Sequence, residues 1–585
     1  MAQQLNHSRL LGYHDFFPGE ESILKLTLGK KIGRKLAMEF CCHFLAHYRN
    51  NAIPPIDQLL REWFTYQELQ HHQSIAYSYF ENQLKKIRLG DPGTNFILIP
   101  AESLLNMFAW ITTQPEIPAE VEGGPDQMLP TLQLLLLFND DLLLRFSNAN
   151  REMPGVDPAR RPAQVIFAQS FPQHDLTNPD YAQLLNTQFF KAALLLDFMA
   201  GNSIYQALLD GLLNEFRCTT KEQYYRGIAA AAVFGIKSQN NGWTILNVPH
   251  DNDYAFNCFL LDKLSTYQES IEDLKDDYRL LRTKPLRKLE EGKYLVIFDL
   301  FLVKRVYNGL IFYLSDLAKR QPALISDFFG KIRQDFSEGH LVYNTLRYIY
   351  PGKGIIQFSG TDFKNSGLTD SEPDYYIRID NKILLFESKD FYIKGEEKYS
   401  FDFNVIERAL KEGRLGKAIL QLRKNILRIL QMALTLDSSY DPSKLIIYPV
   451  VLVHEALYSA PGLNYFIQFW MDDALNEASK DQQFKNLDFA KVAPVTIIEI
   501  DSLLLYEQNF RLNQLNLLSL ISQFHYWVNY KREPRDGTDF RSQSWRSMLS
   551  FSEFLRDKAK DLDIRLESGR LNDLLDKFGL GNRSR

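Results

Sequence analysis

The stretch that decides the fold is EPDYYIRIDNKILLFESKD, residues 372–390. It predicts two short β-strands joined by a tight polar turn. Side chains alternate between the two faces of a strand, so Glu387 and Lys389 point the same way while Ser388 points away. A hairpin brings its far ends together, so Asp374 can lie beside Glu387. The stretch therefore predicts two carboxylates and an ammonium converging at one edge of a sheet.

These three charged groups have the chemistry of a metal-dependent hydrolytic site. Two carboxylates can hold a divalent metal ion, and such an ion can direct water onto a phosphodiester. Their place after the apolar run ILLF (383–386) needs a reason, because charge at the end of a buried strand is costly. The alternative is a strand end that emerges into water with a solvated Glu and Lys. The Glu-x-Lys pattern also occurs at 291–293 and 396–398, where polar surroundings indicate solvated charges.

The stretch resembles the PD-(D/E)xK nuclease superfamily, whose core is the restriction-endonuclease fold. Pro373-Asp374 match the PD element, and Glu387-Ser388-Lys389 match the (D/E)xK element. The resemblance implies that Asp374 and Glu387 bind Mg²⁺ or Mn²⁺, helped by the backbone carbonyl of Ser388. It also implies that Lys389 positions or activates the attacking water and stabilises developing charge.

A third carboxylate is the next candidate ligand, since members of the superfamily often add one from the helix before the strands. A helix is predicted over Phe328 to Tyr350, where Pro351-Gly352 stop it. Glu338 lies where the pattern would put this ligand, and Asp335, one turn earlier, could compete. A solvated helix glutamate is the alternative without a function.

A long basic helix is predicted after the motif, over about residues 404–434. Within 404–430, seven basic residues against two acidic ones leave a local charge of +5, so the helix could track phosphates. Lys417 and Gln421 lie one turn apart and share a face. The resemblance implies that such a Lys or Gln faces the site, which makes Gln421 a candidate catalytic residue. The candidate substrate-binding residues are Arg414, Lys417, Arg423 and Lys424, and a solvated helix face is the alternative.

The order of predicted elements indicates the architecture. Residues 320–510, which the resemblance covers, show helix, three strands, helix, strand, helix and strand, the order of an α/β/α sandwich. Residues 1–319 have apolar side chains three and four apart and predict a mainly helical region of one or two domains. Residues 511–585 return to helix. We therefore expect a multidomain protein: a mainly α-helical N-terminal region, an α/β/α restriction-endonuclease-like core and a helical C-terminal extension.

The composition limits the classes of function. A chain of 585 residues is too long for one core, and its net charge of −5 gives no whole-chain electrostatic case for nucleic acid. Any basic surface must be local. The apolar stretch 294–317 contains charges and predicts a buried strand and helix rather than a membrane span. With four cysteines and no basic start followed by an apolar block, we expect a cytoplasmic protein that binds no membrane.

The expected function is that of a magnesium-dependent endonuclease. DNA is favoured over RNA as the partner because most of the superfamily acts on DNA, which is an argument by analogy. A nuclease within a large helical frame also suits microbial genome defence, again by analogy. Two alternatives stay open: a catalytically silent nuclease fold that binds nucleic acid or protein, and a scaffold whose helical N-terminal region binds a protein partner or forms an oligomer.

Overall fold

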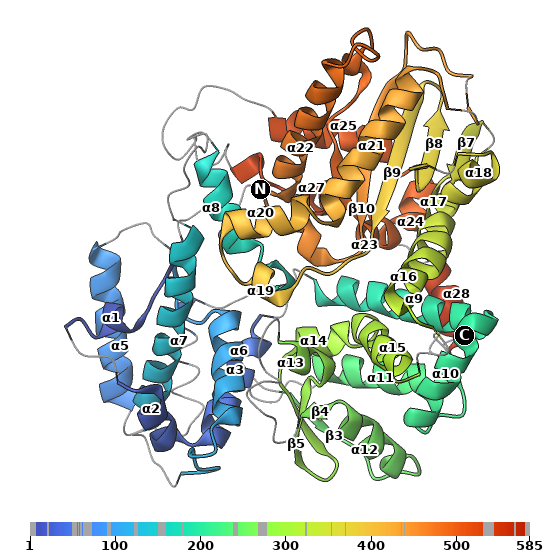
Figure 1. The fold of residues 1–585 in the computed structure, drawn as a ribbon. Coiled ribbons are helices and arrows are strands. Elements are labelled where there is room, and N and C mark those ends of the chain that lie inside the picture. Colours follow the sequence, from blue (N-terminus) through green and yellow to red (C-terminus); the bar gives the residue numbers. More distant parts are fainter. Residues whose placement is uncertain are drawn as a thin grey trace. The chain divides into compact units, whose positions relative to one another are not determined.

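In the computed structural model the chain divides into two compact units. The first comprises Met1–Asn148, Leu176–Leu324 and Leu575–Arg585, and the second comprises Ala149–Asp175 and Ile325–Leu574. The ribbon is drawn in Figure 1. The structure describes residues 8–19, 23–48, 55–56, 58, 61, 73–90, 95–121, 127–149, 160–177, 180–237, 244–266, 278–321, 325–352, 354–368, 370–434, 436–437, 439–529, 543, 545–566 and 569–579.

The first unit is mainly helical, as predicted, and also holds small sheets that were not predicted. Strands β1 and β2 pair in parallel, and four more strands form a sheet in the order β3-β6-β5-β4. The apolar stretch 294–317 forms the predicted strand followed by helices. The helices are α1 (Tyr13–Phe16), α2 (Lys25–Ile32), α3 (Arg34–Ala46), α5 (Gln73–Gly90), α6 (Ala101–Thr113), α7 (Met128–Ala149), α9 (Tyr181–Ala200), α10 (Ser203–Glu215), α11 (Lys221–Lys237), α12 (Tyr254–Lys263), α13 (Arg279–Thr283), α14 (Asp299–Lys304) and α15 (Asn308–Arg320). The strands are β1 (Ser8–Leu10), β2 (Asn95–Ile97), β3 (Ile245–Asn247), β4 (Ser265–Thr266), β5 (Leu286–Glu290) and β6 (Lys293–Val296).

Two of these helices begin at side-chain caps. Asp180 accepts hydrogen bonds from the backbone at the start of α9, and Asn202 does the same for α10, which satisfies N–H groups that a helix start leaves unpaired. Within the described residues, no single helix has the length and apolar character needed to cross a membrane. Helices α9 and α10 meet that test only when taken together, with a bend of 115° between them.

The second unit is built on a five-stranded mixed sheet in the order β11-β10-β9-β8-β7. Strand β8 pairs antiparallel with both β7 and β9, while β10 is parallel to both β9 and β11. The predicted order of helices and strands is observed, except that a short helix, α18 (Gly360–Asn365), lies between the first two strands. The strands are β7 (Ile355–Ser359), β8 (Tyr375–Ile379), β9 (Lys382–Lys389), β10 (Ile446–Val453) and β11 (Thr496–Glu499). The helices are α8 (Arg161–Ser170), α16 (Phe328–Ile332), α17 (Tyr343–Ile349), α18 (Gly360–Asn365), α19 (Gly395–Lys398), α20 (Phe403–Lys411), α21 (Arg414–Leu430), α22 (Leu463–Ser479), α23 (Ile500–Leu505), α24 (Glu507–Arg511), α25 (Leu517–Asn529), α27 (Phe551–Asp561) and α28 (Gly569–Lys577).

Helices cover both faces of this sheet. On one face, Ile383 and Leu385 of β9 join the apolar core that α20, α21 and α22 complete, and Figure 1 shows α21 lying across the strands. On the other face, Ser522 of α25 bonds to Tyr448 of β10 at 3.3 Å. Because side chains alternate along β9, Glu387 and Lys389 belong to the face that α21 covers.

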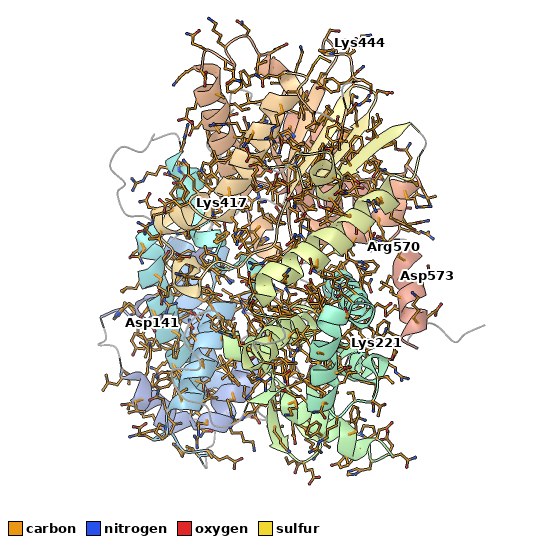
Figure 2. The ribbon with its side chains drawn as sticks, turned by 45° about the vertical axis from the view of Figure 1, so that its right-hand side comes forward. Asp141, Lys221, Lys417, Lys444, Arg570 and Asp573 are labelled. Atoms are coloured by element: carbon orange, nitrogen blue, oxygen red, sulfur yellow. The ribbon has the colours of Figure 1, made fainter. Side chains whose placement is uncertain are left out.

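The limits of the second unit differ from the predicted 320–510. At the N-terminal side, residues 149–175 join it because Phe167 of α8 belongs to its apolar core and its ring packs 5.3 Å from that of Phe466 of α22. At the C-terminal side, residues 511–574 are part of the same unit rather than a separate extension. Arg570, labelled in Figure 2, donates to the Glu507 carboxylate at 2.9 Å and ties α28 to α24. Long-range contacts of this kind leave no local sequence pattern.

Two predicted helices are interrupted. The basic helix predicted over 404–434 is two helices, α20 and α21, which meet at Glu412-Gly413. A Cβ atom on Gly416 would lie only 1.7 Å from the carbonyl oxygen of Lys411, so glycine permits this close junction. The helix predicted over 328–350 holds a π-helix, Arg333–Val342, between α16 and α17. π-Helices are rare, and π-helical turns within α-helices are frequently found at functional sites.

The absence of a side chain at Gly416 should be essential for the close junction between α20 and α21. Alanine is intrinsically favoured over glycine in a helix by about 1 kcal/mol. The Gly416→Ala variant is nevertheless expected to lower the free energy of unfolding by about 1–3 kcal/mol, because the added methyl group meets backbone that cannot move aside. Urea denaturation measures the change. Gly352→Ala is the matched control, since its added Cβ meets only Ile355 at 3.4 Å. Equal stability of the two variants would contradict the assigned contact.

Candidate active site at the end of strand β9

The predicted catalytic residues converge at the carboxyl end of β9. Lys389 Nζ lies 3.0 Å from Glu387 Oε2 and 3.7 Å from Asp374 Oδ2. The backbone N–H of Ser388 donates to Asp374 Oδ2 at 2.6 Å. The antiparallel pairing of β8 with β9 puts Asp374, just before β8, opposite the end of β9. The expected convergence of two carboxylates and an ammonium is therefore confirmed.

Burial makes this cluster electrostatically unusual. Glu387 is 0% exposed, and within the described part of the chain its Oε1 atom has no hydrogen-bond partner. Burial and the neighbouring charge of Asp374 raise the pKa of Glu387 well above its usual value. Burial disfavours the charge on Lys389, but the attraction of Glu387 and Asp374 prevails and raises the pKa of the lysine. Two carboxylates thus share one ammonium, so the cluster has more acidic groups than basic ones.

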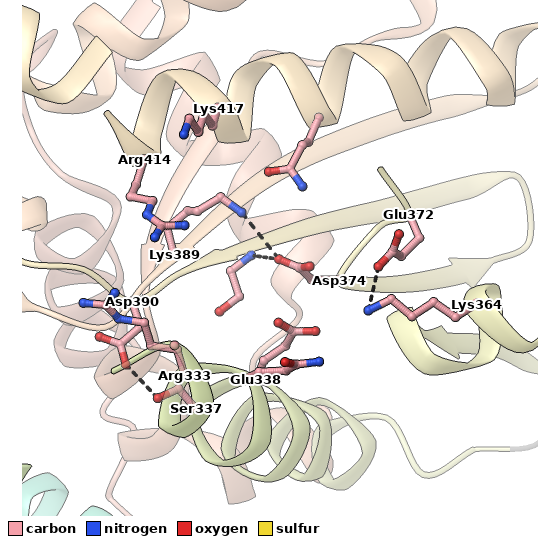
Figure 3. A pocket seen from close by; sticks show the side chains of 14 residues that line it. Arg333, Ser337, Glu338, Lys364, Glu372, Asp374, Lys389, Asp390, Arg414 and Lys417 are labelled. Carbon is pink, nitrogen blue, oxygen red and sulfur yellow. Dashed lines mark hydrogen bonds and ion pairs between the residues drawn. The ribbon is translucent and has the colours of Figure 1, made fainter. Parts of the chain in front are cut away.

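A cavity of about 320 Å³ opens above the cluster. Asp374, Ser388 and Lys389 contribute to its lining, whereas Glu387 is fully buried and does not line it. Figure 3 shows the π-helix on one side of the cavity and α21 on the other, with the end of β9 between them. The cavity is therefore assembled from the hairpin and from two helices that precede and follow it in the chain.

The third carboxylate in the cavity is Glu338. It projects from the π-helix, and its Oε1 accepts a hydrogen bond from Tyr343 at 2.8 Å. Burial, with repulsion from Asp374, raises the pKa of Glu338 to about 7. Asp335, the competing candidate, lies outside the cavity lining. Of the two, the structure brings only Glu338 to the site.

The candidate residues of the basic helix separate into two groups. Arg414, Lys417 and Gln421 line the cavity from α21. Arg423 instead forms an ion pair with Glu477 at 3.2 Å, and Lys424 pairs with Asp370, both outside the cavity. A role of Arg423 and Lys424 in substrate binding stays a prediction. The shared face of Lys417 and Gln421 does meet the candidate site.

Several lining residues were missed by sequence reasoning. Lys364 and Glu372 form an ion pair of 2.8 Å at the cavity, and Ser337 donates to Asp390 at 2.7 Å. Glu372 and Asp390 are the first and last residues of the stretch 372–390. Their nearness to Asp374 and Lys389 in the sequence could have indicated that they also reach the site. Four further lining residues precede the predicted Glu338 on the same helical segment, so a helical stripe could have indicated them: Gly330 of α16, and Arg333, Gln334 and Ser337 of the π-helix.

Ser388 is held by contacts of both its side chain and its backbone. Its side chain points to the opposite face of the sheet from Glu387 and Lys389, as predicted, and its Oγ lies 2.9 Å from His454 Nε2. Its backbone N–H binds Asp374 on the strand edge. The serine is therefore held on two sides, which fixes the orientation of its peptide group, including the carbonyl expected to assist the metal ion.

The residues fit a divalent metal ion with few protein ligands. No group of three or more His, Cys, Asp or Glu side chains within the described ranges is arranged to hold a metal ion. Mg²⁺, however, is usually bound by one or two carboxylates, with water and phosphate completing its ligands. The unpartnered oxygen of Glu387 suits that role. Lys389 Nζ lies between Asp374 and Glu387, where a cation would be attracted, so the ammonium would have to shift as a metal ion binds.

Comparisons of the chain with protein-family models, with curated proteins and with solved structures find no match. The resemblance to PD-(D/E)xK nucleases therefore stays a prediction.

Metal binding is expected to stabilise the folded protein. A ligand at about 100 times its Kd adds about 2.7 kcal/mol, so Mn²⁺ or Mg²⁺ should raise the unfolding temperature. Asp374→Asn and Glu387→Gln should lose most of this rise. Lys389→Ala should keep it, since the ammonium is not a ligand and repels the cation. Scanning fluorimetry measures the shift, with Asp335→Asn as the control outside the cavity. A full metal-induced shift in both carboxylate variants would exclude this metal site.

Proposed function

We propose that the protein is a metal-dependent nuclease that hydrolyses phosphodiester bonds. The observation that carries the proposal is the buried Glu387 with the half-buried Asp374 and Lys389, at a cavity with basic side chains on its wall. Phosphodiester hydrolysis needs compensation of negative charge on the phosphate and a water molecule held in line with it. The cluster can supply both functions once a metal ion is bound.

The protein's own residues have separable roles in this proposal. Asp374 and Glu387 would hold Mg²⁺ or Mn²⁺ together with the carbonyl of Ser388, and Glu338 is placed to bind it directly or through water. The ion would offset charge on the scissile phosphate and lower the pKa of bound water. Lys389, displaced from the carboxylates, would donate to the attacking water or to a phosphate oxygen. Gln421 would orient the same water or phosphate from α21.

DNA is the proposed substrate, by analogy with the superfamily that the motif resembles. The positive charge of the cavity wall suits DNA and RNA alike, because contacts to phosphate do not read the bases. A role in microbial genome defence is part of the proposal, by analogy with nuclease domains set in a large helical frame. The alternative function, a silent fold that binds nucleic acid or protein without cleaving it, predicts binding with no metal-dependent product.

Cleavage is expected to require Mg²⁺ or Mn²⁺. Full-length protein should cut plasmid or single-stranded DNA in either ion, and a chelator should stop the reaction. Ca²⁺ should bind without supporting cleavage, because it prefers more ligands and looser geometry than this site offers. Gel electrophoresis of plasmid, single-stranded DNA and RNA incubated in parallel measures the products. Undiminished cleavage in the chelator would refute the metal-dependent mechanism.

The three clustered residues should each be required for turnover. Asp374→Asn, Glu387→Gln and Lys389→Ala are expected to lower the cleavage rate by about 100-fold or more, the loss typical when one group that stabilises charge is removed. Lys382→Ala is the matched control, because Lys382 is an exposed lysine at the other end of β9. Near wild-type rates in two of the three variants would show that the active site lies elsewhere.

A further inference from the structure

The basic side chains of the cavity differ in how far their charge is neutralised. Five of them line it, and two have acidic partners: Lys389 with Glu387 and Asp374, and Lys364 with Glu372. The three that remain are Arg333, Arg414 and Lys417. Within the described ranges, none of these three forms an ion pair or a hydrogen bond.

Arg333 is the least expected of the three. Its Nε atom is buried without a hydrogen-bond partner in the described part of the structure, and its guanidinium lies 5.2 Å from the ring of Phe329. A buried N–H that finds no acceptor costs free energy. Arg333 belongs to the π-helix, whereas Arg414 and Lys417 belong to the first turn of α21. Two separate elements thus direct uncompensated positive charge into one cavity.

These three cations lie to one side of the carboxylate cluster. Figure 3 shows Arg333 and Arg414 on one side of Asp374, with the Lys364–Glu372 pair on the other. Asp390 is the acidic residue on the same side as the arginines, but it accepts a hydrogen bond from Ser337 and makes no ion pair of 4.0 Å or less with them in the described structure. The cavity therefore attracts anions on one side of the cluster only.

We infer that Arg333, Arg414 and Lys417 form a subsite for a second phosphate of the substrate, next to the phosphate that is cleaved. This inference rests on the proposed nuclease function. A nucleic-acid strand carries its phosphates at a regular spacing, so a strand with one phosphate at Lys389 presents another beside it. One guanidinium group can donate two parallel hydrogen bonds to a phosphate, so two arginines that line one cavity suit a phosphate ligand. The second phosphate is either the next internal diester or a terminal monoester.

Short oligonucleotides test the subsite by the gain in affinity that one added phosphate gives. The probes are d(TpT), with one phosphate, and d(pTpT), d(TpTp) and d(TpTpT), each with two. Binding to full-length Lys389→Ala protein in Mg²⁺ is measured by calorimetry, because the expected loss of turnover keeps the probes largely intact during the measurement. At least one two-phosphate probe is expected to bind about tenfold more tightly than d(TpT), the usual scale of a charge-assisted contact. A gain with d(TpTpT) identifies an internal phosphate, and a gain limited to d(pTpT) or d(TpTp) identifies a terminal one.

The decisive variants remove equal charge from two places. Adding Arg333→Gln and Arg414→Gln to the same background should abolish the gain from the second phosphate. Adding Arg423→Gln and Lys424→Gln should preserve it, because those residues lie outside the cavity. Thermal unfolding verifies that both combinations are folded. The inference is overturned if no two-phosphate probe shows a gain, or if the gain survives loss of the two arginines.

The subsite and the proposed nuclease function can fail separately. If wild-type protein cleaves no nucleic acid in Mg²⁺ but the gain depends on Arg333 and Arg414, the subsite stands and the hydrolytic function falls. If cleavage occurs and no gain is found, the function stands and the subsite falls.

Discussion

The pairing of β8 with β9 places a buried carboxylate, Glu387, beside a half-buried one, Asp374, and the rest of the site depends on that constraint. Asp374 and Glu387 are brought together by backbone register, and the bond from the Ser388 N–H fixes the first of them. Their repulsion is relieved only in part by Lys389. A cluster that is short of positive charge and lies at the base of a cavity is suited to take up a cation.

A second buried cluster of charged groups, on the same face of the sheet, differs from the Glu387 cluster because its hydrogen bonds are complete. Arg378 of β8 bonds to Asp437, which also accepts from Tyr376 at 2.7 Å. Burial alone would raise the pKa of Asp437, but hydrogen bonds from Arg378, Tyr376 and Ser439 lower it. That network is satisfied and serves the fold. Glu387 keeps an unpartnered oxygen and a raised pKa, which is the condition expected of a functional rather than a structural charge.

The helices around the site are shaped by local departures from regular geometry. The π-helix allows Arg333 and Glu338 to face one cavity, and a Cβ on Gly339 would lie 3.1 Å from the carbonyl of Gln334 five residues earlier. At the other wall, Gly416 lets α21 begin close against the end of α20. Both glycines relieve contacts with backbone, so the position of the cavity walls is fixed by main chain rather than by exchangeable side chains.

The sequence by itself determined the hairpin, the shared face of Glu387 and Lys389, and the nearness of Asp374. These follow from the two-residue period of a strand and the closure of a short turn, which are local properties. The order of helices and strands in the second unit was likewise readable from apolar periodicity. Glu338 and Asp335 could not be separated, because the choice depends on the helix's exact winding.

Only the tertiary structure decided which distant residues complete the site and the unit. Arg333 became part of the cavity through the packing of the π-helix beside β9, and residues 149–175 joined the apolar core through Phe167. Lys424 forms an ion pair with Asp370 and does not line the cavity. Each of these outcomes depends on contacts between residues far apart in the chain, whose formation is set by the packing of the whole unit and not by any local pattern of sequence.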